Sequence, residues 1–232
     1  MIAIITIDGP ASSGKSTVAS TLASRLGYLH LNSGLLYRFS GYLASREGVG
    51  LDDQMGIIEL LDSKELRFKV SDSSKSIFLV NGKPVDEDLT SPDNSERASH
   101  VATLPKLREK LTGLQREVIL NSTLPGAVLE GRDAGTVVFP DAGHKFYLDA
   151  DPRIRADRRL RERCRLANTK VPESGSAEYQ QLFDEVFEDL SRRDQLDSSR
   201  IHSPNRVAED ALVVDTSDLS IEQVLEKVKS FL

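Results

Sequence analysis

The stretch ITIDGPASSGKSTVASTLASRLG (residues 5–27) decides the fold of this chain. Residues 9–16 have the spacing G-x-x-x-x-G-K-[ST], in which backbone N–H groups surround a phosphate. Glycines permit this turn because they adopt φ values that are closed to other residues. An apolar run precedes the turn, and a helical pattern with Val18, Leu22 and Leu26 on one face follows it. The stretch therefore predicts a phosphate-binding loop between a buried strand and a helix.

The loop residues predicted to bind ATP are Gly9, Pro10, Ala11, Ser12, Ser13, Gly14, Lys15, Ser16 and Thr17. We expect Lys15 to reach the β- and γ-phosphates and the Ser16 hydroxyl to ligate Mg²⁺. The following helix directs its N-terminal N–H groups at the same anion. A guanine-specific switch protein would need an Asn-Lys-x-Asp segment, which NTKV (168–171) does not provide. The small size of the chain and its scattered arginines favour a kinase.

Five short apolar runs predict a parallel sheet that is buried on both faces. They span residues 2–8, 28–31, 126–131, 145–150 and 211–215. Because they alternate with helical patterns, we expect a three-layer α/β fold with a central five-stranded sheet. Gly27 predicts the end of the first helix, and Ser220 with Gln223 predicts a capping box at the start of the last.

Residues 65–88 break this alternation. Two alternating strand-like runs flank a Ser/Asp turn, and Asn81-Gly82 follows as a strong hairpin signal. We therefore expect a small antiparallel insertion on the parallel core.

The composition is that of an ordinary globular domain. Of 232 residues, 39% are hydrophobic and 28% are charged, and the net charge of −6 argues against a nucleic-acid partner. The single cysteine, Cys164, excludes an internal disulfide and fits a reducing compartment. The chain shows neither a leader pattern nor an apolar run long enough to cross a membrane. We expect a cytoplasmic protein with no membrane partner.

Two segments suggest a second phosphate-binding group. LNSGLLYR (31–38) offers the Ser33 hydroxyl, the Arg38 guanidinium and the apolar body of Tyr37 beside them. Arg132 and Asp133 directly follow a predicted strand, where ligands bind in open α/β sheets. A bare Arg-Asp pair is otherwise a surface ion pair worth little.

The segment DPRIRADRRLRERCR (151–165) carries seven arginines before a Pro-, Gly- and Ser-containing loop at 168–179. Arginines near a mobile loop suit a lid that closes over a transferring phosphoryl group. Arg158 and Arg159 are the candidates for that contact, and we expect the other five to face solvent. Further on, Arg193, Asp197 and Arg200 share one helix face, as a salt-bridge ladder or as a ligand-binding triad. The residues alone favour the ladder.

Together these motifs resemble the bacterial cytidylate kinases. The likeness runs nearly end to end through ITIDGPASSGKST, LNSGLLYR, EGRDAGTVVFPDA, KFYLDAD, the Arg-x-x-x-Asp-x-x-Arg segment and AEDALVVDT. It implies one P-loop kinase domain over residues 1–232. The core would comprise 1–30, 115–150 and 206–232, the acceptor-binding part about 31–114 with its β insertion at about 64–90, and the helical lid about 151–180.

The resemblance also implies roles for individual residues. Ser33, Arg38, Arg132 and Arg200 would hold the CMP phosphate, and Arg193 and Asp197 would lie at the sugar and phosphate. Ser99, Arg108 and Asp133 would read the cytosine, whose N4 amino group suits a carboxylate. Tyr37 completes the predicted CMP site. The resemblance also changes the interpretation of the Arg193, Asp197 and Arg200 triad from a structural ladder to a functional, ligand-binding group.

The predicted reaction is transfer of a phosphoryl group from Mg²⁺-ATP to CMP or dCMP, with Lys15, Arg132, Arg158 and Arg159 as catalytic residues. The family further implies a monomer. Two alternatives stay open. One is a kinase of the same fold acting on UMP, AMP or shikimate, and the other is a nucleotide sensor without turnover.

Overall fold

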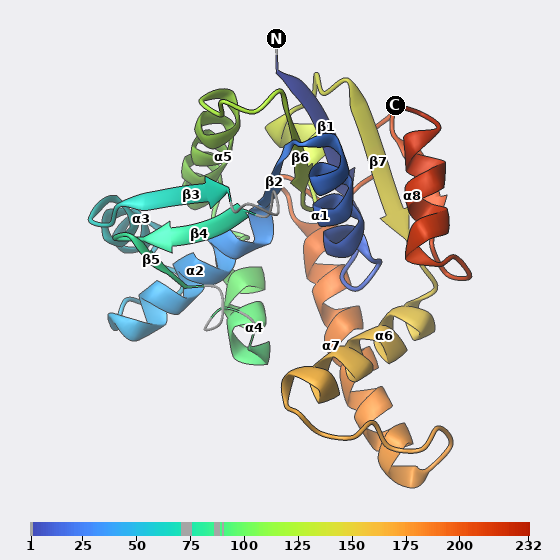
Figure 1. Ribbon diagram of the computed structural model, residues 1–232. Helices are drawn as coiled ribbons and strands as arrows, with labels where there is room; N and C mark the ends of the chain where they lie inside the picture. Colours follow the sequence, from blue (N-terminus) through green and yellow to red (C-terminus); the bar gives the residue numbers. More distant parts are fainter. Residues whose placement is uncertain (1, 71–75, 86–88, 90) are drawn as a thin grey trace.

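Five parallel strands form the centre of the molecule, in the order β2-β6-β1-β7-β8 (Figure 1). The computed structural model describes residues 2–70, 76–85, 89 and 91–232. The strands are β1 (Ala3–Asp8), β2 (Leu29–Asn32), β6 (Gly126–Glu130), β7 (His144–Asp149) and β8 (Leu212–Asp215). All four pairings between neighbours are parallel. The predicted sheet is confirmed, because each of the five apolar runs forms one of its strands.

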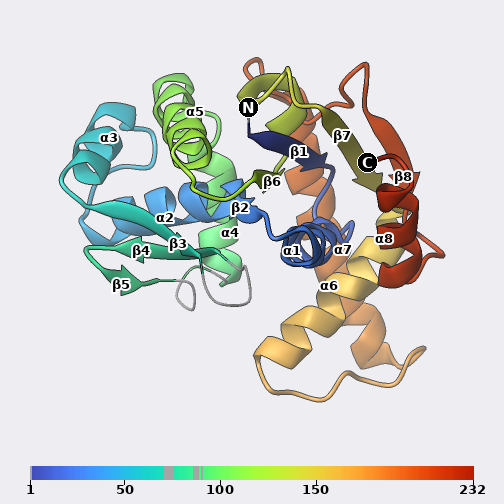
Figure 2. The ribbon, with the colours of Figure 1, turned by 45° about the horizontal axis from the view of Figure 1, so that its top comes forward.

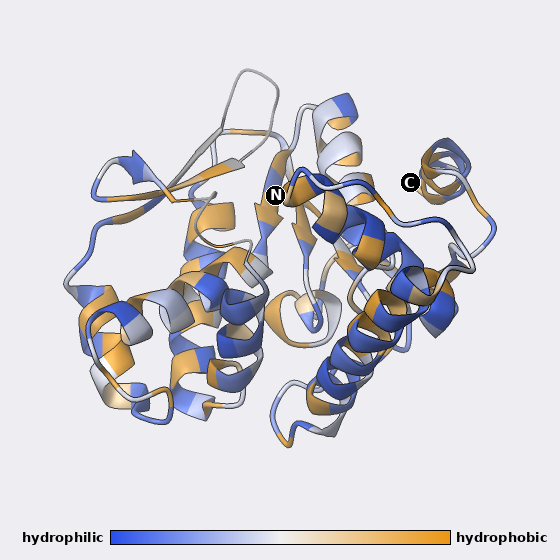
Figure 3. Cartoon of the chain, turned by 90° about the horizontal axis from the view of Figure 1, so that it is seen from below, coloured by the Kyte–Doolittle hydropathy of each residue, from blue (hydrophilic) through white to orange (hydrophobic). Residues whose placement is uncertain are grey.

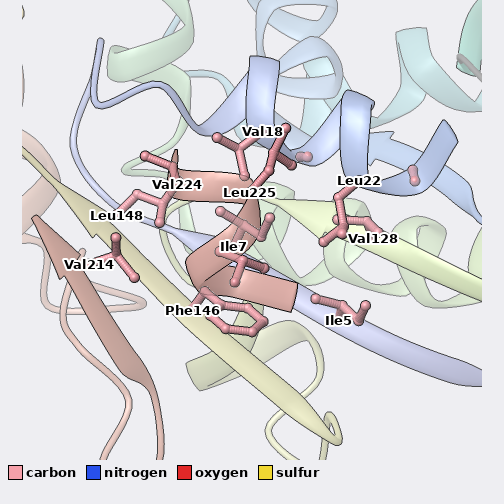
Figure 4. Packing of buried hydrophobic residues seen from close by; sticks show 13 residues of the cluster. Ile5, Ile7, Val18, Leu22, Val128, Phe146, Leu148, Val214, Val224 and Leu225 are labelled. Atoms are coloured by element: carbon pink, nitrogen blue, oxygen red, sulfur yellow. The ribbon is translucent and has the colours of Figure 1, made fainter. Parts of the chain in front are cut away.

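Helices cover both faces of this sheet. On one face, α1 (Lys15–Leu26) and α8 (Ile221–Lys229) pack on the strands, where Ile7, Leu22 and Leu225 are fully buried (Figure 4). On the other face, α5 (Pro105–Leu120) and the short π-helix η2 (Ala134–Val138) pack against β2 and β6. Side chains alternate along a strand, so Ile5 and Ile7 of β1 pack under α1 and α8, whereas Ile4 packs on the other face.

The helix ends follow their local sequence signals. Gly27 ends α1 at a φ of 66°, and its N–H donates to the carbonyls of Ala23 and Ser24. At the start of α8 the Ser220 side chain accepts from the Gln223 N–H, and the Gln223 side chain accepts from the Ser220 N–H. Both predicted caps are confirmed.

A second, antiparallel sheet lies beyond the β2 edge, with the order β3-β4-β5 (Figure 2). Its strands are β3 (Leu66–Val70), β4 (Ser76–Val80) and β5 (Lys83–Pro84). Asn81 and Gly82 both have positive φ, 49° and 76°, as a two-residue hairpin turn requires. The predicted insertion is confirmed, although its Ser/Asp turn at 71–75 lies outside the described residues.

The antiparallel sheet shares a hydrophobic core with α2 (Ser33–Arg46), α3 (Gln54–Asp62) and α4 (Pro92–Val101), and with Leu107 and Leu111 of α5. Phe78 is fully buried there and meets Phe39 of α2 edge to face, with 5.3 Å between ring centroids. This second core, which also includes Leu36 and Ile57, is separate from the core under α1 and α8. The helices that carry Ser33, Tyr37, Arg38 and Ser99 of the predicted acceptor site therefore pack around this second core.

Helices α6 (Pro152–Leu166) and α7 (Ala177–Ser199) form a hairpin that extends away from the sheet (Figure 1). Leu160, Phe183 and Leu190 are buried between the two helices. Hydrophilic residues make up much of the rest of their surface (Figure 3). Across the described residues, neither these helices nor any other is long and apolar enough to cross a membrane.

The buried carboxylate of Asp8 ties the end of β1 to the start of η2. It accepts hydrogen bonds from the backbone N–H groups of Ala134, at 2.8 Å, and Gly135, at 2.7 Å. Burial, reinforced by the charge of Asp133, raises the pKa of Asp8 to about 6, although the two hydrogen bonds and Lys15 favour the ionised form. The loop after β6 is thus held directly beside the residue that precedes the phosphate loop.

This arrangement predicts that Asp8 makes the free energy of unfolding depend on pH. Because the pKa of an unfolded aspartate is about 4, the folded state holds the Asp8 proton more tightly than the unfolded state does. The contribution of Asp8 is thus greatest below pH 4 and is lost as pH rises through about 6. Between pH 7.5 and pH 5 the free energy of unfolding of the wild type should gain about 1.5 kcal/mol relative to Asp8→Asn.

Urea unfolding at pH 7.5, 6 and 5 measures this difference. Asp141→Asn, at an exposed position, controls for the loss of one negative charge. A difference between wild type and Asp8→Asn that stays constant with pH would contradict the assignment.

Candidate active site

Two glycines give the loop between β1 and α1 its shape. Gly9 has a φ of 143°, and a Cβ there would lie 2.0 Å from the carbonyl oxygen of Leu148 on β7. Gly14 has a φ of 92°, in the left-handed region that disfavours a side chain. Ser12 lies between them at a φ of 61°, which is uncommon for a residue other than glycine. The loop therefore packs closely against the sheet and turns sharply into α1.

Lys15 is buried with its ammonium group turned onto its own loop. Its Nζ donates to the Pro10 carbonyl at 2.5 Å and lies 3.4 Å from the Ser13 Oγ. Burial, together with the nearby charge of Arg132, lowers the pKa of Lys15 well below its ordinary value. A phosphate anion at the loop would oppose both effects, so this lysine is suited to bind one.

Ser16 belongs to a hydrogen-bonded chain that the sequence reasoning did not find. Its Oγ donates to Glu130 Oε2 at 2.6 Å, and the His30 ring lies 3.0 Å from Glu130 Oε1. Burial raises the pKa of Glu130, but hydrogen bonds from His30 and Ser16 outweigh burial and lower it overall. The signal that could have indicated Glu130 is an acidic residue at the end of an otherwise apolar strand.

The oxygen atoms at this point fit a magnesium ion. Mg²⁺ prefers hard oxygen ligands and usually takes one or two from the protein and the rest from phosphates and water. The Ser16 hydroxyl and the ionised Glu130 carboxylate are such groups, and they lie beside the phosphate loop. The donor set is therefore compatible with the predicted role of Ser16.

Asp197 of α7 connects two arginines of the predicted acceptor site. It accepts from Arg132 Nε at 2.8 Å and forms an ion pair with Arg200. Burial raises the pKa of Asp197, but the charges of the two arginines lower it overall. The intrahelical ladder that the residues alone favoured is only half formed, because Arg193 makes no ion pair within the described part of the chain.

Asp133 and Arg108 form a buried ion pair beside Tyr37. Arg108 Nη2 donates to Asp133 Oδ2 at 2.5 Å, and its Nη1 donates to the Ala102 carbonyl at 2.9 Å. The guanidinium carbon lies 5.2 Å from the centre of the Tyr37 ring. Because Asp133 and the Ala102 carbonyl hold the Arg108 guanidinium in place, the ion pair can present a fixed pattern of donors and acceptors to a planar ligand.

The two predicted hydroxyl groups lie on helices next to this pair. Ser33, at the start of α2, donates to the Glu130 carbonyl at 2.8 Å. Ser99, on α4, donates to the Ser95 carbonyl at 3.2 Å. Both side chains are buried and line the same cavity.

Arg38 and Arg193 have no hydrogen-bond or ion-pair partner among the residues that the structure describes. Burial and the charges of Arg132 and Arg38 lower the pKa of Arg193 to about 10. Burial and the charges of Arg159 and Arg132 likewise lower the pKa of Arg38. Enclosed guanidinium groups that repel one another form a binding site for an anion such as phosphate.

One cavity of about 1070 Å³ connects all these groups. The predicted site residues that line it are Ala11, Ser12, Ser13, Gly14, Lys15, Ser16, Thr17, Ser33, Tyr37, Arg38, Ser99, Arg108, Arg132, Asp133, Arg158, Arg159, Arg193, Asp197 and Arg200. Gly9 and Pro10 are not among the residues that line this cavity, and their contribution is to the shape of the loop. Residues from six separate sequence segments thus surround one space, although their individual roles stay predictions.

The arginine-rich helix α6 differs in part from expectation. Arg153, Arg161 and Arg165 are exposed as predicted, but Arg155, also expected to face solvent, is only 6% exposed. The prediction for Arg155 was wrong because the residue borders the apolar face of α6 that packs on α7.

The two predicted lid arginines are both engaged with protein groups. Arg158 donates to the hydroxyl and carbonyl oxygens of Thr216, and Arg159 donates to Glu162 Oε2 at 2.7 Å. Neither guanidinium is therefore free in this conformation, although both line the cavity.

Comparisons with known proteins agree with this geometry. A sequence model described as cytidylate kinase matches residues 5–232. The cytidylate kinase of Caldicellulosiruptor bescii is 39% identical over 97% of this chain and 92% of its own length. That of Carboxydothermus hydrogenoformans is 39% identical over 97% and 94%, respectively. A solved Thermus thermophilus structure, TT1252, is far more distant, at 17% identity and a TM-score of 0.46 over 100% of this chain and 98% of its own. On the strength of the family match and the curated relatives, this chain belongs to the cytidylate kinase family.

Proposed function

We propose that this chain transfers the γ-phosphoryl group of ATP to CMP and dCMP, giving ADP with CDP or dCDP. The observation that carries the proposal is one cavity lined both by the phosphate loop and by Arg38 and Arg193, neither of which has a hydrogen-bond or ion-pair partner among the described residues. A cavity with two phosphate-binding ends suits a reaction between two nucleotides. The names of the curated relatives supply the identity of the acceptor.

The donor half binds the triphosphate through the loop. Backbone N–H groups and Lys15 would hold the β- and γ-phosphates, and Ser16, kept in place by Glu130, would hold Mg²⁺. The bound ion would neutralise charge on the phosphates and orient them. Lys15 then exchanges its bond to the Pro10 carbonyl for bonds to the phosphate oxygens, which gives the buried ammonium a partner of opposite charge.

The acceptor half would read cytosine through the Asp133–Arg108 pair. Asp133 accepts from the N4 amino group, and Arg108 with Ser99 donates to the N3 and O2 atoms. Uracil reverses the donor pattern at positions 3 and 4, so the same protein groups would be left unpaired. A site built around hydrogen bonds rejects such an analogue strongly.

The transfer needs no general base, because the attacking group is already a phosphate oxyanion. Arg132 and Arg38 lie where they can position that oxyanion, and charge stabilisation and alignment would supply the rate. Arg159 would leave Glu162, and Arg158 would leave Thr216, to contact the transferring group when α6 and α7 close. The division into core, acceptor-binding part and lid, the monomeric state and the cytoplasmic location remain predictions.

An acceptor panel tests the proposed reaction. ADP release should be fastest with CMP and dCMP, and slow or absent with UMP, AMP and shikimate, because only cytosine matches the pattern of Asp133 and Arg108. Lys15→Ala, the control for the active site, should lower kcat by at least about 100-fold, since one preorganised cation on the transferring group is lost. A different acceptor in first place, or ATP binding without any turnover, would overturn the proposal.

Asp133→Ala should relax the preference for cytosine. The ratio of kcat/KM for CMP to that for UMP should fall about 10- to 100-fold, because a hydrogen bond to a charged group is lost. The ratio is taken within one protein sample, so a reduced fraction of folded enzyme does not affect it. Asp141→Ala, at an exposed position after η2, is the matched control and should keep the wild-type ratio. Retention of that ratio in Asp133→Ala would exclude a base-reading role.

A further inference from the structure

Arg155 contacts three separate parts of the molecule from a buried position. Its Nε donates to the Ala150 carbonyl at 3.0 Å, at the root of α6. Its Nη1 donates to the Asp194 carboxylate of α7 at 2.5 Å and to the Ala11 carbonyl of the phosphate loop at 3.3 Å. One guanidinium thus joins the phosphate loop, the base of the α6–α7 hairpin and the helix that carries Arg193 and Asp197.

Arg155 contacts the phosphate loop at the backbone carbonyl of Ala11. The carbonyl of Ala11 shares a peptide unit with the N–H of Ser12, and Ser12 lines the cavity. A cation that donates to the carbonyl polarises this unit and makes its N–H a stronger donor. The Ala11 side chain is itself buried against Leu160 and Phe183, so the loop packs on the hairpin as well as bonding to it.

A second connection runs parallel to the first, one turn further along α6. Arg158 Nη1 donates to the Thr216 hydroxyl at 3.1 Å, and that hydroxyl lies 3.0 Å from the Ser13 carbonyl. Two arginines of α6 therefore support two carbonyls of the phosphate loop from outside. Of the two, only Arg155 also contacts α7.

The link to α7 leads to the acceptor half of the cavity. Asp194 directly follows Arg193, whose guanidinium has no partner in the described part of the chain, and precedes Asp197 by three residues. Displacement of this segment of α7 would move the Asp194 carboxylate, and with it the guanidinium that holds Ala11. Arg155 thus connects the phosphate loop to the segment of α7 that carries Arg193 and Asp197.

We propose that Arg155 is a positioning residue that couples the donor loop to the acceptor helix, so that binding of either nucleotide strengthens binding of the other. The inference rests on the proposed function, because it assumes two nucleotides in one cavity. The first nucleotide orders the loop and α7 together through Arg155, and the second then binds to a half that is already ordered. Without the guanidinium, each nucleotide orders only its own half.

The test is a binding cycle measured by calorimetry. The Kd of the β,γ-imido analogue of ATP, with Mg²⁺, is measured without and with saturating CMP, and the Kd of CMP without and with the analogue. For each nucleotide, the ratio is its Kd without the other nucleotide divided by its Kd with the other nucleotide present. We expect this ratio to be about 5 or more in the wild type and the same for both nucleotides. In Arg155→Met, which keeps the aliphatic length but no donors, the ratio should fall below about 2, with the Kd of CMP alone within about twofold of wild type.

Arg153→Met is the matched control, because Arg153 lies on the same helix but is exposed, sits over the Phe183 ring and does not line the cavity. Its ratio should equal that of the wild type. Asp194→Asn leaves Arg155 on the loop but weakens its link to α7, and it should also lower the ratio. If Arg155→Met does not fold, Asp194→Asn decides the question.

Three outcomes overturn the inference. They are a wild-type ratio of 1, an unchanged ratio in Asp194→Asn and in any folded Arg155→Met, and loss of coupling in Arg153→Met. A merely structural role would lower the melting temperature and the active fraction but would leave the ratio unchanged. The proposed function fails separately, if the wild type does not bind CMP or does not release ADP with it.

Discussion

The burial of positive charge is the constraint on which the lining of the cavity depends. Lys15 is buried and Arg38 and Arg193 are half-buried, and burial together with the charge of neighbouring arginines lowers the pKa of each. A folded chain tolerates such groups when carboxylates lie close enough to offset the repulsion. Glu130 and Asp197 do so here, and nearby cations and hydrogen bonds keep the pKa of each below its ordinary value despite burial. The remaining positive charge faces the cavity, where substrate phosphates would bind.

The same constraint explains why side chains far apart in the sequence meet here. Arg132 follows β6 and Asp197 lies 65 residues later on α7, yet they bond directly. Arg155 and Asp194, 39 residues apart, do likewise. Because neither member of such a pair is stable alone in a buried position, the position of α7 is tied to the loops at the end of the sheet. Electrostatic pairing thus complements the apolar contacts of Leu160 with α7 and with Ala11 of the phosphate loop.

Local signals in the sequence predicted the frame and the shape of the phosphate loop well. The strands, the Gly27 cap and the Asn81-Gly82 turn depend on neighbouring residues, and the phosphate loop depends on a fixed spacing of glycines and Lys15. The arginine run was harder to interpret, because the burial of a cation depends on a distant carboxylate. Ala156, Leu160 and Cys164 form the buried stripe of α6, and Arg155, Arg159 and Arg163 each precede one of them. Residues that border an apolar stripe are the ones that a partner helix encloses, so the pattern held a signal for Arg155 that the high density of arginine obscured.

Glu130 and Asp8 were missed for a related reason. Each is a single acidic residue at the end of an apolar strand, and one sequence does not distinguish such a residue from a solvent-exposed strand end. In the structure the two carboxylates hold opposite sides of the same site, since Glu130 bonds to Ser16 of α1 and Asp8 bonds to the start of η2. Arg155 supports the phosphate loop from a third side through Ala11. These bonds hold the loop N–H groups close to their binding geometry, and the first nucleotide would complete the ordering of the loop together with the α6–α7 hairpin that Arg155 joins to it.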